Sequence, residues 1–177
     1  MNLRSGLTAA MAAAAVFLTS SSPTIAADPE IARGQYLVTI MGCGDCHTAG
    51  HFFGHPDTAH PLAGSDVAFG LPEGTFAGPN LTPDKETGLG NWTVPQIVTA
   101  ITKGERPDGR ALAPVMPWRG FSHLTAQDAR AIAVYLKSLT PVSNRVPGPF
   151  GPREKAESFV MTIIPAEVYA TLPKPPQ

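Results

Sequence analysis

The only two cysteines of this chain lie three positions apart and are followed at once by a histidine. Cys43 and Cys46 flank the dipeptide Gly-Asp, and His47 comes directly after the second cysteine. This arrangement is compatible with four structures: a redox-active disulfide, half of a zinc site, an inert disulfide, or the point at which a haem is covalently attached. The rest of the chain decides among them.

The first three structures each lack something that they need. A thioredoxin-like pair sits at the start of a helix in a βαβ unit, whereas here the pair follows the end of a predicted helix and no βαβ pattern is present. A disulfide across two residues closes a small loop and stabilises little. A zinc site needs four ligands, and no third cysteine exists. The residues that could still complete such a site are His51, His55, His60 and His123.

The fourth structure uses all three residues at once. In a CxxCH segment the two thiols bind the two vinyl groups on one edge of the porphyrin, and the two intervening residues set their separation. His47 then lies beneath the iron and can bind it through an imidazole nitrogen. Because the chain has no other cysteine, we expect one haem c and no more.

The first 27 residues have the features of an export signal. Arg4 provides a positive start, residues 7–20 are apolar, and small residues follow up to Ala27. A retained anchor helix is the alternative, but the apolar run is shorter than the roughly 20 residues that span a bilayer. We therefore expect residues 1–27 to be a cleaved signal peptide and the mature protein to reside in the periplasm.

Composition narrows the class of protein further. The formal net charge of −1 is too small to indicate nucleic acid or an anionic membrane as a partner. Residues 28–177 suffice for a single domain with its own core. The 17 glycines and 19 prolines are many for a domain that regular structure alone stabilises. A large buried cofactor would organise such loops.

Three helices are predicted, and no strand pairs. The first runs from Asp28 to about Met41, with Asp28 as its cap. The second begins after Thr93, which forms a capping box with Gln96, and ends at Gly104. The third begins after Thr125, carries its apolar face along residues 132–139, and stops before Pro141. This pattern predicts an all-α fold.

Long irregular segments separate and follow these helices. Residues 48–91 and 105–124 contain many turn-forming residues, and a proline-rich extension begins at about residue 141. A short helix is expected around residues 152–161 of the extension. A loop as long as 48–91 is unusual in a compact domain unless it wraps a ligand.

A second axial ligand has to come from a distant segment, because the haem plane separates the two faces of the iron. Met116 lies between Pro114 and Pro117, which stiffen its loop and suit the presentation of one thioether. Met41 precedes the motif too closely to reach the other face, and Met161 lies in the C-terminal extension. Bis-histidine ligation through His60 or His123 is the alternative, since His51 and His55 follow His47 too closely. The roles of His51, His55 and His60 are left open, a surface metal site among them.

These residues together resemble the class I c-type cytochromes. A helix before CGDCH, a loop methionine and a last helix with Tyr135 follow that family's order. Residues 79–93, 108–118 and 124–142 are similar to small exported cytochrome c proteins and subunits that serve periplasmic dehydrogenases. The resemblance implies a monohaem cytochrome c fold in which the first and last helices cross. It also makes Trp92 and Asn80 candidates for the haem pocket.

The expected function is electron transfer without catalysis by the chain itself. With His47 and Met116 on the iron, no position is left for a substrate, and single electrons pass through the haem edge. The resemblance implies a periplasmic dehydrogenase as donor and another cytochrome or an oxidase as acceptor. The alternatives are a fixed haem c subunit of an oxidoreductase complex, and a haem enzyme or sensor with an open sixth position.

Overall fold

The computed structural model describes residues 28–173. The expected signal peptide, residues 1–27, lies outside the described residues, as do residues 174–177. In chain order the elements are α1 (Pro29–Ile40), α2 (Cys43–His47), the 3-10 helix η1 (His51–Phe53), β1 (Val67–Leu71), β2 (Gly74–Ala77), α3 (Val94–Lys103), α4 (Trp118–Phe121), α5 (Ala126–Ser138), β3 (Phe159–Thr162) and α6 (Ala166–Tyr169). Within the described part of the chain, no helix is long and apolar enough to cross a membrane.

The three predicted helices are confirmed, with the expected caps. The Asp28 carboxylate accepts a hydrogen bond from the Glu30 amide at the start of α1. Thr93 and Gln96 form the complete capping box of α3. Gly104 ends α3 in the left-handed conformation, with φ of 72°, which glycine adopts without strain. Local sequence signals therefore set the ends of these helices.

Helix α5 packs across α1 at a point where only glycine fits. A Cβ at Gly34 would overlap the Ala131 carbonyl and lie 2.6 Å from the Cβ of Tyr135, so the two helix backbones touch here. An Arg33–Asp128 ion pair of 2.8 Å flanks the crossing. Helix α3 packs on the other side of α5. The buried core between these helices consists mainly of Leu37, Val38, Leu89, Ile97, Ile132 and Leu136.

A three-stranded sheet, in the order β2-β1-β3, corrects the expectation of an all-α chain without strand pairs. Strands β1 and β2 form an antiparallel hairpin, and β3 pairs in parallel with β1. The hairpin strands are short and contain glycine, and β3 comes from a segment about 90 residues away. Such pairing leaves little periodic signal in the local sequence. The expected helix at 152–161 is also wrong, because this segment leads into β3 and the short helix α6 follows later.

The C-terminal extension, residues 141–173, is joined to the domain by specific hydrogen bonds. The side-chain amide of Asn80 donates to the Val142 carbonyl over 2.7 Å, and that of Asn144 donates to the Ala63 carbonyl over 2.8 Å. Phe150 forms an antiparallel bridge with Thr75. The extension is thus an ordered layer on the domain.

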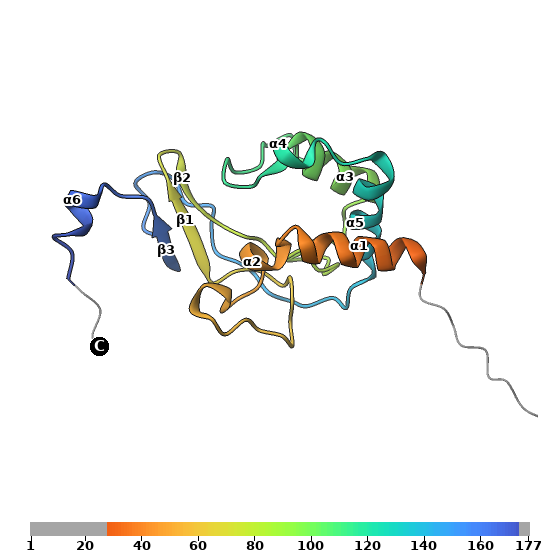
Figure 1. The fold of residues 1–177 in the computed structure, drawn as a ribbon, viewed down its shortest axis with the longest axis horizontal. Coiled ribbons are helices and arrows are strands. Elements are labelled where there is room, and N and C mark those ends of the chain that lie inside the picture. Colours follow the sequence, from red (N-terminus) through yellow and green to blue (C-terminus); the bar gives the residue numbers. More distant parts are fainter. Residues whose placement is uncertain (1–27, 174–177) are drawn as a thin grey trace, which may run out of the picture.

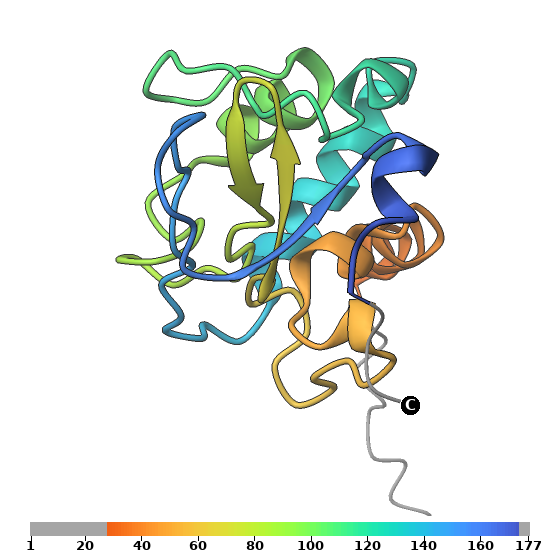
Figure 2. The same cartoon turned by 90° about the vertical axis from the view of Figure 1, so that its left-hand side faces the viewer.

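The molecule has two halves with α2 between them (Figure 1). We call α1, α3, α4 and α5 the helical half, and η1, the sheet and the C-terminal extension the sheet half. Seen from the end that carries the sheet, the β1–β2 hairpin lies in front of the helices (Figure 2). The CGDCH segment is therefore placed where the two halves meet.

Candidate haem site

The CGDCH segment forms its own short helix, α2, separated from α1 by a tight turn. Gly42 makes this turn in the left-handed conformation, with φ of 66°. Cys43 and Cys46 are three residues apart on this turn of helix, so both side chains project to similar sides. Neither forms a disulfide. Two free thiols are thus presented together at the junction of the halves.

Both thiols lie in surroundings that disfavour the thiolate. Burial raises the pKa of Cys43 to about 11, with a smaller contribution from the Asp45 charge. Burial also raises the pKa of Cys46. A redox-active pair needs a lowered thiol pKa. These cysteines therefore do not have the electrostatics of a thioredoxin-like site, which agrees with the sequence argument.

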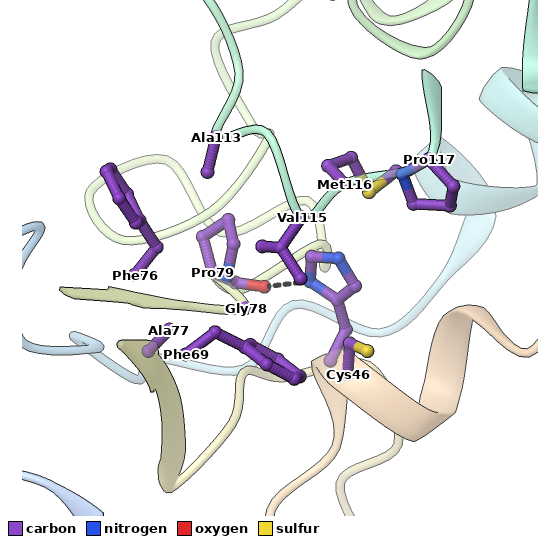
Figure 3. A pocket seen from close by; sticks show the side chains of 11 residues that line it. Cys46, Phe69, Phe76, Ala77, Gly78, Pro79, Ala113, Val115, Met116 and Pro117 are labelled. Carbon is purple, nitrogen blue, oxygen red and sulfur yellow. Dashed lines mark hydrogen bonds between the residues drawn. The ribbon is translucent and has the colours of Figure 1, made fainter. Parts of the chain in front are cut away.

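His47 is buried and held by one main-chain hydrogen bond. Its Nδ1 donates to the Pro79 carbonyl over 2.8 Å, as the dashed line in Figure 3 shows. The carbonyl can only accept, so Nδ1 carries the proton and Nε2 keeps a lone pair. Burial also lowers the pKa of His47, which favours the neutral ring. A neutral imidazole with its Nε2 free is the form that binds a metal.

Gly78 allows the Pro79 segment to approach α2 closely. A Cβ at Gly78 would overlap the carbonyl of Cys46 and lie 3.2 Å from the His47 Nδ1. On the other side of the helix end, the His47 carbonyl accepts from the Gly64 amide over 2.8 Å. The orientation of His47 therefore depends on the path of two backbone segments.

Met116 lies in the loop between α3 and α4, as the sequence predicted. The Met116 amide donates to the Ala113 carbonyl, and its own carbonyl accepts from the Trp118 amide over 2.8 Å. Figure 3 shows Met116 and Pro117 on this loop, across the pocket from Cys46 on α2. The loop is thus fixed at both ends of the methionine.

Two apolar cavities are both lined by His47 and Met116. The first has about 480 Å³ of space outside protein atoms, part of it open to solvent, and includes Cys46, Phe69 and Phe76 in its wall. The second has about 710 Å³ of such space, again partly open to solvent, and includes Cys43 and Trp92. The remaining wall of the second cavity consists of core residues such as Leu81, Leu89, Ile97, Ile132 and Leu136. One thiol thus borders each cavity, and the histidine and methionine border both.

An arginine that sequence reasoning missed, Arg106, lies beside these cavities, with its side chain 27% exposed and its Nε buried. The Arg106 guanidinium stacks 5.2 Å from the centre of the Trp92 ring, and its Nε is buried without a hydrogen-bond partner among the described residues. Its nearest carboxylate oxygen, on Asp108, is 3.5 Å from Nε. Arg106 lines a third cavity that shares Phe76 and other residues with the first. A partly buried cation with an unpartnered Nε–H donor fits an anionic group at this edge.

Asn80, expected in the pocket, lines neither of the two apolar cavities. It is almost fully buried, and its side chain is saturated by hydrogen bonds. Its oxygen accepts from the Thr82 amide and hydroxyl, while its nitrogen donates to Thr87 and to the Val142 carbonyl. Asn80 thus fixes the loop behind Pro79 to the C-terminal extension.

The alternative iron ligands lie away from both cavities, except Met41. His51 is 3.6 Å from Asp45, and His60 forms a 2.9 Å pair with Asp57 at the surface. His55, His60 and His123 are exposed. In residues 28–173, no three His, Cys, Asp or Glu side chains come together to hold a metal ion. Met41 lines the second cavity only, and Met161 is exposed on β3.

The fold places two thiols, an imidazole and a thioether in the walls of two apolar cavities. The family model for cytochrome c matches residues 31–140. The chain belongs to the cytochrome c family. This membership implies a covalently bound haem c, for which Cys43 and Cys46 of CxxCH are the attachment residues.

Several curated proteins are similar to the chain. It is 35% identical over 144 residues to the cytochrome c subunit of quinone alcohol dehydrogenase from Gluconobacter oxydans, and 34% identical over 141 residues to the fructose dehydrogenase cytochrome subunit from Gluconobacter japonicus. These matches cover 80% and 76% of the chain, but 28% of each relative. A diheme cytochrome c-type protein from Cereibacter sphaeroides is 30% identical over 148 residues, which are 79% of the chain and 49% of that relative. The chain thus spans about a quarter to a half of these relatives.

The residues at the junction fit such a haem. The cavity walls are apolar, as a porphyrin ring requires, and a thiol borders each cavity. An uncharged imidazole and a thioether are donors that suit haem iron. Arg106 adds a partly buried positive charge that suits the propionate carboxylates.

Proposed function

We propose that this chain is a monohaem c-type electron-transfer protein with His47 and Met116 as the two axial ligands of the iron. The observation that carries this proposal is that His47 and Met116 both line both apolar cavities, with one attachment cysteine bordering each. The haem, when bound, supplies reversible one-electron chemistry. One haem is proposed because the chain has only two cysteines.

In this proposal the residues around the haem orient its ligands, bind its propionates or exclude water. Pro79 orients the His47 ring and increases its donor strength through the Nδ1 hydrogen bond. The loop around Met116 presents the thioether, which raises the potential relative to bis-histidine ligation. Arg106 and Trp92 bind the propionate edge. Phe69 and Phe76 exclude water from the first cavity.

We propose that the protein carries electrons in the periplasm and does not itself transform a substrate. With both axial positions filled, the iron has no open site, so electrons pass through the haem edge. The names of the relatives as cytochrome subunits of dehydrogenases support a dehydrogenase as donor. A second cytochrome or a terminal oxidase is the proposed acceptor. Residues 1–27 are the proposed signal peptide.

A second candidate is a fixed haem c subunit of an oxidoreductase complex. The ordered C-terminal extension, which continues beyond the family match at residue 140, favours it. Co-purification with a flavin, quinone or molybdenum subunit at both low and high salt is expected for a fixed subunit. A freely diffusing carrier is expected to elute alone at physiological salt.

The deciding experiment is spectroscopy of the purified exported protein in both oxidation states. We expect the absorption bands of haem c after denaturing extraction of unbound haem, and the sulfur-to-iron band in the oxidised form. We also expect no rapid binding of carbon monoxide by the reduced form. Absence of covalent haem would refute the whole proposal, whereas rapid carbon monoxide binding would refute the methionine ligand and favour an open sixth position.

A further inference from the structure

The largest group of exposed apolar side chains lies on the sheet half. Phe159, Val160, Met161 and Ile163 come from β3 and the residue after it, and Phe53 of η1 stacks on Phe159 with ring centres 4.9 Å apart. We call these five residues the β3 patch. Ile163 is 97% exposed, although isoleucine is among the residues most often buried. Side chains alternate along a strand, so Phe159 and Met161 lie on one face of β3 and Val160 on the other. An exposed apolar group of this size is typical of an interaction site.

The β3 patch also carries an open backbone edge. Strand β3 is the last strand in the order β2-β1-β3, and no further strand of residues 28–173 pairs with it. Residues 158–166 contain no charged side chain, and only one proline, Pro165, which lies after the strand. Proteins usually protect such an edge with charges, bulges or a covering segment. An unprotected apolar edge is suited to receive an extended segment from another protein.

The β3 patch lies close to the wall of the first apolar cavity. Phe69 of β1 lines this cavity, and its register partner in β3 is Met161. Neighbouring strands are about 4.8 Å apart. Phe52, the neighbour of Phe53, stacks on Phe69 with ring centres 5.7 Å apart. A protein bound at the β3 patch is therefore separated from the cavity by little more than one strand.

Charge indicates what kind of partner fits. Three basic and three acidic side chains are distributed over the described part of the C-terminal extension, and they are Arg145, Arg153, Lys155, Glu154, Glu157 and Glu167. This balance produces no strong field of either sign, so long-range steering is weak. Apolar contact and main-chain pairing have to hold the partner.

From these observations we propose that the β3 patch is the docking site of the electron-donating dehydrogenase, which adds an extended apolar segment to the edge of β3. The inference rests on the proposed electron-transfer function. Closeness to the haem cavity is what a redox partner needs, whereas a second copy of the chain or a lipid surface has no need of it. Among redox partners, the dehydrogenase is inferred because the relatives are named as cytochrome subunits of dehydrogenases. The parallel pairing of β3 with β1 keeps this surface in a fixed position relative to the cavity that Phe69 of β1 lines.

Photo-crosslinking in the bacterium that makes the protein tests the proposal. Holoprotein with benzoylphenylalanine in place of Ile163 is compared with holoprotein carrying it in place of Tyr36, which is 53% exposed on α1. We expect an adduct at position 163, identified by mass spectrometry as a dehydrogenase subunit, and none with that subunit at position 36. An adduct only with a second copy or with lipid, equal adducts at both positions, or none at 163 would overturn the proposal.

The dehydrogenase identified in this way then serves as electron donor in a rate measurement. Reduction of Ile163→Lys holoprotein is expected to be slower than that of wild type by about tenfold or more. The reason is that a charge replaces an apolar side chain that the docked dehydrogenase would bury. The matched Tyr36→Lys variant is expected to react like wild type, and added salt should change the wild-type rate little. Equal rates for both variants would contradict the docking site.

A small reductant separates the two proposals. Ascorbate needs no docking surface, so it should reduce wild type and both lysine variants equally. If the haem c spectrum is present but the crosslinks and rates do not depend on position 163, the docking inference alone fails. If the wild-type protein carries no haem c, the proposed function fails.

Discussion

In the helical half, α1, α3 and α5 bury their apolar side chains against one another, whereas in the sheet half all four residues of β3 are exposed. The helical half has strong local caps and a close backbone crossing at Gly34. The sheet half depends on contacts between distant segments, such as that of Asn144 with Ala63. The helical half is a core of helices that pack on one another. The sheet half lies beside it and exposes the apolar strand β3 to a partner.

The two apolar cavities connect these halves. Phe69 and Phe76 of the sheet half line the first cavity, and Ile132 and Leu136 of the helical core line the second. A haem that fills both cavities is therefore part of the packing of both halves. The helical half depends on local sequence signals and the sheet half on contacts between distant segments, but both would pack against the same haem.

The largest effect is expected from removal of both attachment cysteines. Cys43→Ala with Cys46→Ala should abolish covalent haem, which haem staining after denaturing electrophoresis measures. Because the cavities then lose their occupant, we expect a large loss of helical circular dichroism as well. Native helix content in this variant would show that the helical half packs without haem, and would sharpen the contrast between the halves.

Replacement of Met116 tests the point at which the halves meet. Met116→Ala should remove the sulfur-to-iron band and lower the potential by on the order of 100 mV, within the roughly 0.8 V over which axial ligands set it. Potentiometric titration measures the shift. Met161→Ala, which truncates an exposed methionine of β3, is the control and should leave the potential unchanged. An unchanged potential in Met116→Ala would place the sixth ligand elsewhere.

Substitution of two glycines, Gly34 and Gly78, should affect different properties of the protein, namely its stability and its haem spectrum. Gly34→Ala forces α1 away from the Ala131 carbonyl and should lower the free energy of unfolding by about 1–3 kcal/mol, with little change in the haem spectrum. Gly78→Ala pushes against the Cys46 carbonyl and should alter the spectrum through the displaced His47 ring.

Gly120→Ala is the matched control for both glycine variants. Its Cβ would meet no atom within 4 Å, so stability and spectrum should both stay close to wild type. Denaturant unfolding and visible absorption are the two measurements. If Gly78→Ala changed only stability, Gly78 would serve packing alone, as Gly34 does. The prediction that Gly78 controls the orientation of His47 would then be wrong.

The smallest effect concerns the ion pair across the α1–α5 crossing. The Arg33 guanidinium, helped by the Thr125 hydroxyl, lowers the pKa of Asp128 below its usual 3.8. A lowered carboxyl pKa stabilises the fold above pH 3.8, and this stabilisation is lost as the pH falls through the folded-state pKa. Asp128→Asn should therefore destabilise slightly at neutral pH and match wild type in strong acid, as denaturant midpoints would show. If the variant were less stable than wild type by the same amount at both pH values, the effect would come from the capping interaction with Thr125 at the start of α5 and not from the ion pair.

The helical half could be predicted from sequence because its signals are local. Asp28, Thr93 and Thr125 each cap a helix within three residues, and apolar spacing marks the buried faces. The CGDCH motif is likewise local, and it indicates haem attachment directly. The prolines on either side of Met116 make this methionine a candidate ligand. His47 and Met116 both line the two cavities at the junction, and their binding to iron stays a prediction.

The rest depends on contacts that no local pattern encodes. Strand β3 pairs with β1, and although its β-branched and aromatic residues favour a strand, no local pattern identifies that distant partner. Asn80 lies one residue from Pro79, yet its side chain points into a polar network while the Pro79 carbonyl receives His47. Arg106 resembles a surface arginine in the sequence, since only the fold buries its Nε beside Trp92.

The carbonyl of Pro79 is a main-chain atom, so no side-chain substitution can remove the acceptor of the His47 hydrogen bond. With haem bound, this bond strengthens the imidazole as a donor and favours ferric iron. The close approach at Gly78 makes that chain path hard to alter. Under the proposed ligation, a substitution can replace the Met116 thioether directly, but it can reach the His47 hydrogen bond only by moving the chain around Pro79.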